Sequence, residues 1–78
     1  MNAATAHDYW RGKRDGIDLA AGYPSGFLRE YVARHPDPPT PWTGEQAHTA
    51  GFCLGIAIVV ERRRLRFWEN SRKRLTIH

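Results

Sequence analysis

The chain has 78 residues, a formal net charge of +4, one cysteine and 41% hydrophobic residues. A single domain of this length buries about 60–65% of the surface of its unfolded chain, which excludes a deep, closed active site. One cysteine cannot form an intramolecular disulfide, and the hydrophobic content suffices for a small core, so we expect a folded rather than a disordered chain.

The N-terminal segment predicts a helix that ends near Ala21. Thr5 or Asp8 is expected to cap its start, because the side-chain oxygen of either residue can accept a hydrogen bond from a backbone N–H of the first turn. Apolar residues recur at spacings of three and four, which is typical of one helical face on a core. This face contains Tyr9, Trp10, Ile17, Ala20 and Ala21.

A second, shorter helix is predicted from Ser25 or Gly26 to about Arg34. It follows a break at residues 22–26, where two glycines and a proline disfavour continuation of the first helix. The spacing of its apolar residues predicts one face toward the core. That face consists of Phe27, Leu28, Tyr31 and Val32.

Residues 36–41 include four prolines and therefore predict an extended linker rather than a helix. Trp42 follows the linker and is expected to anchor it to the body. Thr43 and Gln46 then match a capping box, in which each side chain bonds to the backbone N–H of the other residue. A long third helix is predicted to begin there.

Residues 52–60 are open to two interpretations. Bulky and small side chains alternate there with the period of a strand, yet the same residues also fit a helical stripe. The capping box and the lack of a partner strand favour the helix. The predicted fold is mainly α, a small three-helix domain with a proline-rich linker before a long third helix. The alternative is an α+β fold with a C-terminal strand or hairpin.

A helix from Gly44 to Leu75 would be about 48 Å long, whereas a compact domain of this size is about 30 Å across. The end of the third helix must therefore project, bend or dock. We expect two parts: a compact helical body over residues 1–60 and a basic extension of the third helix over residues 61–78. The extension carries seven basic and two acidic side chains, a formal charge of +5, against −1 for the body.

A separated positive field attracts polyanions or an acidic protein face. Arginine can bond two phosphate oxygens at once, and an exposed Phe67 or Trp68 could stack on unpaired bases. In the competing interpretation both aromatic side chains pack on the body and the arginines form its solvated rim. The predicted nucleic-acid-binding residues are Arg62, Arg63, Arg64, Arg66, Phe67, Trp68, Arg72, Lys73 and Arg74.

The motif Gly-x-x-x-Gly-Ile occurs twice, at residues 12–17 and 51–56. Glycine inside a soluble helix costs up to about 1 kcal/mol relative to alanine, so four such glycines indicate that close backbone approach is useful. A tight crossing of the first and third helices explains them most simply, and a self-association face that forms a homodimer is the alternative. The residues concerned are Gly12, Gly16, Ala20, Ala47, Gly51 and Gly55.

The sequence contains no pattern typical of an active site. None of its four histidines lies three or four residues from another histidine or from Cys53, and this spacing argues against a metal site. Asp15 and Asp18 are typical of a solvated helix surface. We predict no enzymatic activity, no cofactor and no bound metal, and we expect Cys53 to be a buried small hydrophobe.

The N-terminus lacks a basic region followed by an apolar run, and the longest apolar stretch, residues 50–60, is shorter than the roughly 20 residues of a membrane span. We therefore expect a cytoplasmic protein that does not contact a membrane. Its high usage of alanine, arginine and glycine suggests a GC-rich bacterial or phage genome.

Arg11-Gly12 through Gly16-Ile17, a proline-containing connection and a second glycine-bearing helix together resemble the pattern of ribosome modulation factor, two short helices on ribosomal RNA. The resemblance covers only the residues around the two glycine pairs, and the Cys-Pro-Tyr and paired-tryptophan segments of that pattern are missing. It implies RNA rather than duplex DNA as a partner. A long, proline-rich connection is also unlike the short turn of a helix-turn-helix.

These observations predict a small non-enzymatic binding protein that delivers a basic, aromatic-containing C-terminal segment to nucleic acid, in particular RNA or a ribonucleoprotein. The alternative is a protein-binding regulator or inhibitor, for example a phage-encoded host modulator, that contacts an acidic protein surface.

Overall fold

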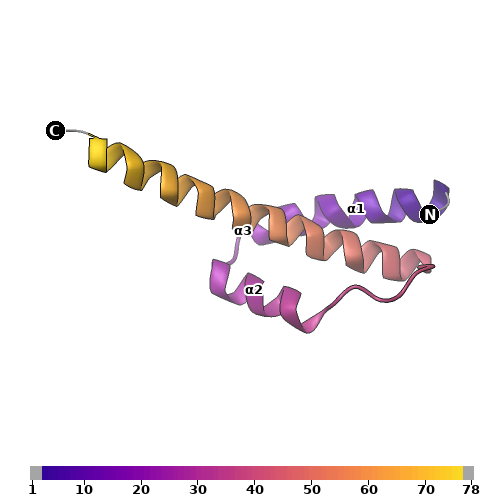
Figure 1. Cartoon of the computed structure of the whole chain (residues 1–78). Coiled ribbons are helices and arrows are strands. Elements are labelled where there is room, and N and C mark those ends of the chain that lie inside the picture. The colour runs from indigo at the N-terminus through magenta and orange to yellow at the C-terminus, as the bar shows by residue number, and fades with distance from the viewer. Residues whose placement is uncertain (1–2, 77–78) are drawn as a thin grey trace.

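A computed structural model describes the backbone of residues 3–76 and the side chains of residues 3–72. It contains three helices, α1 (Ala3–Ala20), α2 (Ser25–Arg34) and α3 (Gly44–Thr76) (Figure 1). Residues 3–76 contain no strand, so the mainly α fold is confirmed. The alternative of a strand or hairpin over residues 52–60 is wrong, because that segment is an internal part of α3, packed on α1 through its glycines.

The capping box at the start of α3 forms as predicted. The backbone N–H of Thr43 donates to Gln46 Oε1 at 3.0 Å, and the backbone N–H of Gln46 donates to Thr43 Oγ1 at 3.2 Å. These two bonds satisfy backbone donors that have no partner within the helix. From there α3 continues for 33 residues.

The predicted caps of α1 are wrong, because the helix already includes Ala3 and both Thr5 and Asp8 lie inside it. Ala3, Ala4 and Ala6 have the highest intrinsic helix propensity, which extends the helix toward the N-terminus. The other end of α1 is close to the expected position. There the backbone N–H groups of Gly22 and Tyr23 bond back to the carbonyls of Leu19 and Ala20.

Helices α1 and α3 lie side by side and run in the same direction, since Gly12 faces His48 and Gly16 faces Phe52 (Figure 1). The short α2 packs against α3 and runs in the opposite direction. Residues 35–43 then lead back to the start of α3 without forming a helix or strand.

Trp42 holds this connection against α1. Its indole Nε1 donates to the carbonyl of Pro38 at 2.7 Å, and its ring stacks on Tyr9 with the ring centroids 6.0 Å apart. Both contacts agree with the predicted anchoring role. The connection thereby crosses one side of α3 near its N-terminal end.

The core is small and lies where α2 meets α1 and α3. Ala20, Leu28 and Ile56 are fully buried there. Of the residues predicted to face the core, Trp10 and Phe27 are instead 59% and 51% exposed. Five further apolar side chains pack around the core: Tyr31, Val32, Phe52, Val59 and Val60.

The molecule is elongated, with principal dimensions of 54 × 23 × 22 Å, because α3 continues beyond both shorter helices (Figure 1). The length of α3 allowed its end to project, bend or dock, and in the structure it projects. None of the helices within residues 3–76 has the length and apolar character needed to cross a membrane.

Candidate functional site

The predicted glycines lie where α1 and α3 touch. At each of them the backbone of the opposite helix occupies the place of a side chain, so that even a methyl group would collide with a carbonyl oxygen. An added Cβ would lie 2.1 Å from the oxygen of His48 at Gly12, 2.2 Å from that of Phe52 at Gly16, 2.0 Å from that of Tyr9 at Gly51 and 2.2 Å from that of Lys13 at Gly55.

This crossing is internally symmetric. Gly12 faces the residue three positions before Gly51, and Gly51 faces the residue three positions before Gly12. Gly16 and Gly55 repeat the same relation one turn later. The duplicated motif therefore forms its close contact within one chain, as the simpler interpretation predicted, and α1 and α3 cover the small-residue faces that the alternative homodimer would need.

The remaining two residues assigned to this face are also buried. Ala47 and Ala20 are both fully buried, and Ala20 belongs to the core. His48 bridges the two helices at the edge of the crossing, with its Nε2 3.1 Å from Asp15 Oδ2. Both of these side chains are close to half exposed, so the pair adds little stability.

Arg63 differs from the other predicted nucleic-acid-binding residues, because its guanidinium group is used inside the protein. It donates to the carbonyls of Tyr23 and Ala20 at 2.8 and 2.9 Å and to Ser25 Oγ at 3.2 Å. A cation on the last carbonyl of α1 also interacts favourably with the negative end of the helix dipole. Arg63 thus joins α3 to the turn between α1 and α2.

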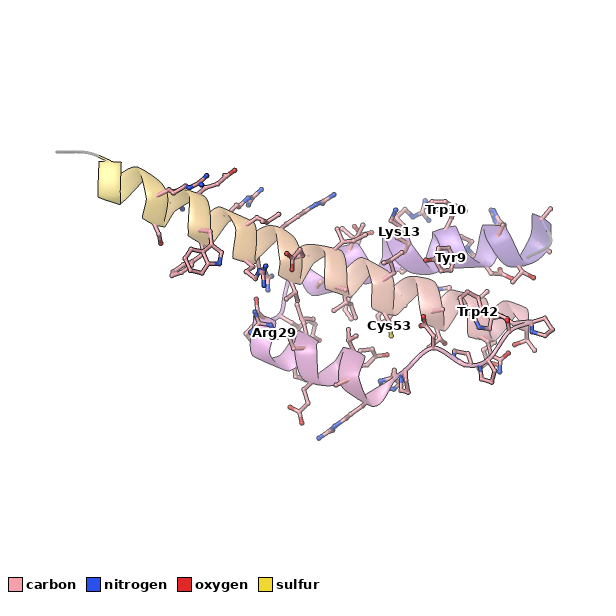
Figure 2. The ribbon with its side chains drawn as sticks, in the orientation of Figure 1. Tyr9, Trp10, Lys13, Arg29, Trp42 and Cys53 are labelled. Carbon is pink, nitrogen blue, oxygen red and sulfur yellow. The ribbon has the colours of Figure 1, made fainter. Side chains whose placement is uncertain are left out.

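Apart from Arg63, the side chains of residues 62–72 extend into open space, clear of α1 and α2 (Figure 2), and we call this end of the helix the projecting part of α3. Phe67 and Trp68 are 66% and 61% exposed, and their rings touch edge to face. The interpretation in which both rings pack on the body is therefore wrong. Leu65 beside them is also exposed.

The basic side chains surround this projecting part of α3 rather than lining one face. Successive residues of a helix are rotated by about 100°, so Arg62 and Arg66 share one flank, and Arg64 lies on the other side with Trp68. Arg64 forms an ion pair with Glu61 at 3.4 Å. Arg72 is exposed. Lys73 and Arg74 continue the helix, but their side chains lie outside the described residues.

A shallow groove of about 290 Å³ runs along the side of α3 that faces the connection. Ala50, Leu54 and Ala57 line its floor, and Tyr9 and residues 35–37 line its edges. Cys53 also lies on this side of α3 (Figure 2).

Cys53 has the properties of a structural thiol. It is 5% exposed and its Sγ lies 3.7 Å from the carbonyl of His35. Burial, assisted by the negative charge of Asp37, raises the pKa of the thiol, and burial also raises the pKa of the Tyr31 hydroxyl. A raised pKa keeps sulfur in its less reactive protonated form. Within the described residues, no cluster of three or more His, Cys, Asp or Glu could hold a metal ion.

Comparison of the chain with known protein families, curated proteins and solved structures gives no match. Two surfaces of the molecule are therefore the candidate sites, the projecting part of α3 and the groove. Two features of these surfaces were not predicted from the sequence: the internal role of Arg63 and the groove itself.

Proposed function

We propose that this chain is a small non-enzymatic binding protein that presents the projecting, basic part of α3 to nucleic acid, and to RNA in preference to duplex DNA. The observation that supports this function is an uncovered helical segment on which exposed arginines lie next to two exposed aromatic rings. The body contributes almost no net charge, so the positive field is concentrated at one end of the molecule.

Each component of this segment suits a different part of an RNA strand. Arg62 and Arg66 lie on one flank and can bond phosphate oxygens, and this contact supplies affinity without sequence preference. An exposed aromatic ring such as Phe67 offers a surface on which an unpaired base can stack, with a contribution of about 1–3 kcal/mol per base. Unpaired bases are typical of RNA loops and single strands.

The exposed apolar area also favours a partner. Leu65, Phe67 and Trp68 are each more than half exposed, and the rings of Phe67 and Trp68 touch. A contiguous exposed apolar patch on a small protein is typical of an interaction site. In the proposed function, a bound strand covers part of this area.

A pair of charge-matched variants tests the proposal. Affinity for a fluorescently labelled single-stranded RNA is measured by anisotropy for the parent, for Arg62→Gln/Arg66→Gln and for the control Arg11→Gln/Arg14→Gln. All four arginines are exposed, but the control pair lies on α1. We expect a large loss of affinity for the α3 pair and little change for the control.

Equal losses for the two pairs would mean that the net charge, not the projecting helix, determines binding. If the parent does not bind RNA at low salt, the proposal is wrong. The alternative, a regulator that binds an acidic protein surface, would then replace it.

A further inference from the structure

The open side of α3 carries a heptad pattern that extends across both the body and the projecting part. Alternating spacings of three and four residues place a row of side chains along one side of a helix, the arrangement that forms the seam of a coiled coil. The row lies between the parts of α3 that α1 and α2 cover. It consists of Leu54, Ala57, Glu61, Arg64, Trp68 and Ser71, which we call the open seam.

The open seam is accessible along its described length. Leu54 is 38% exposed although it lies within the body, and Ala57 is exposed on the floor of the groove. Glu61 and Arg64 are more than half exposed, as is Trp68. At about 1.5 Å per residue the seam is about 27 Å long.

We propose that the open seam binds the open seam of a second copy of this chain, with the two α3 helices antiparallel and their two-fold axis between residues 62 and 63. This register places Glu61 opposite Arg64 of the second copy, and Arg64 opposite Glu61 of the second copy. The central charges are therefore self-complementary.

Side-chain size is complementary in the same register. Trp68 lies opposite Ala57 of the second copy, where the groove provides space beside a methyl side chain. Ser71 lies opposite Leu54 of the second copy. The two outer pairs thus each match a large residue with a small one, the interdigitation that close packing requires.

A parallel pairing would not give these matches. It would place Glu61 against Glu61, Arg64 against Arg64 and Trp68 against Trp68. Like charges face to face are unfavourable, and two indoles at one level would hold the helices apart. The sequence of the seam therefore selects the antiparallel arrangement.

This dimer goes beyond the proposed function and does not depend on it. Arg62, Arg66 and Phe67 lie outside the seam and remain available for RNA in the dimer. Trp68 does not, because it is covered by the second copy, so base stacking falls to Phe67. The dimer would carry two such basic surfaces, one at each projecting helix.

Charge exchange at the centre of the seam tests the register. The molar mass is measured by sedimentation velocity over a range of protein concentrations, with circular dichroism to verify folding. Glu61→Arg and Arg64→Glu should each weaken the dimer by at least about tenfold, since each places like charges across the axis twice. The controls Glu69→Arg and Arg66→Glu make the same charge changes outside the seam and should leave the dimer intact.

Mixing the two seam variants is the decisive step. A heterodimer of Glu61→Arg with Arg64→Glu restores both central pairs, so the mixture should dimerise at concentrations where each variant alone is a monomer. A parent chain that stays monomeric, a dimer insensitive to both seam variants, or a mixture that does not recover would each overturn the proposal.

Discussion

Replacing Gly51 by alanine adds one methyl group at the closest point of the α1–α3 crossing. The added carbon would lie 2.0 Å from the carbonyl oxygen of Tyr9 and 3.0 Å from the backbone nitrogen of Lys13, whereas an ordinary contact of a Cβ is 3.4–4 Å. Both neighbours are backbone atoms, which cannot rotate away as a side chain can. The two helices would have to separate by more than 1 Å at this point.

Two opposing effects determine the stability change. Overpacking a well-packed contact costs about 1–3 kcal/mol, and a collision with backbone belongs at the upper end of that range. Removal of a glycine from a helix returns up to about 1 kcal/mol. We therefore expect Gly51→Ala to lower the free energy of unfolding by about 2 kcal/mol.

Urea denaturation followed by circular dichroism measures this change, with Gly26→Ala as the control. Gly26 is also helical, but an added Cβ there has no heavy atom within 4 Å. The control should be neutral or stabilising by up to about 1 kcal/mol. A Gly51→Ala variant as stable as the parent, or more stable, would refute the close crossing.

Three further predictions concern single side chains. Arg63→Ala should lower the free energy of unfolding by about 1–3 kcal/mol in urea titrations, because it removes three hydrogen bonds to the α1–α2 turn, whereas Arg62→Ala should change it by less than about 0.5 kcal/mol. Thr43→Ala should cost about 1 kcal/mol in the same assay and reduce helicity at the start of α3. Burial stabilises the protonated thiol of Cys53; this contribution is fully present below the ordinary pKa of 9.0 and is lost as the pH rises above it. Stability should accordingly fall at alkaline pH, and less so in Cys53→Ala.

Local signals in the sequence were sufficient for the helices and for the position of the α3 cap. The capping box of Thr43 and Gln46 depends only on residues three apart, so it forms whatever surrounds it. The breaks between helices likewise follow from glycine and proline. Only the start of α1 was misplaced, because the alanines before Thr5 favour a helix more strongly than the caps favour an end.

Apolar patterning was a weaker guide to burial. Trp10 satisfies the helical spacing yet is 59% exposed, because α1 contacts α3 through glycines and not through large side chains. In so close a crossing a tryptophan must lie outside the contact. Hydrophobicity scales give glycine little weight, so the true interface of α1 was visible only in the duplicated motif.

The role of Arg63 could not have been read from the sequence. It lies in a run of three arginines, and nothing local distinguishes it from Arg62 or Arg64. The α1–α3 crossing fixes the rotation of α3 about its axis. In that orientation the side chain of Arg63 points toward the turn between α1 and α2. A role that depends on backbone carbonyls far away in the sequence can be recognised only from the tertiary structure.

The proposed function is tested most directly by the salt dependence of RNA binding. Each phosphate neutralised on a single strand contributes about −0.7 to the slope of log affinity against log salt. With three or four arginine contacts we predict a slope of about −2 to −3 for the parent, and a slope about 1–1.5 shallower for Arg62→Gln/Arg66→Gln. A parent slope near zero, or an unchanged slope in this variant, would contradict phosphate recognition by the projecting part of α3.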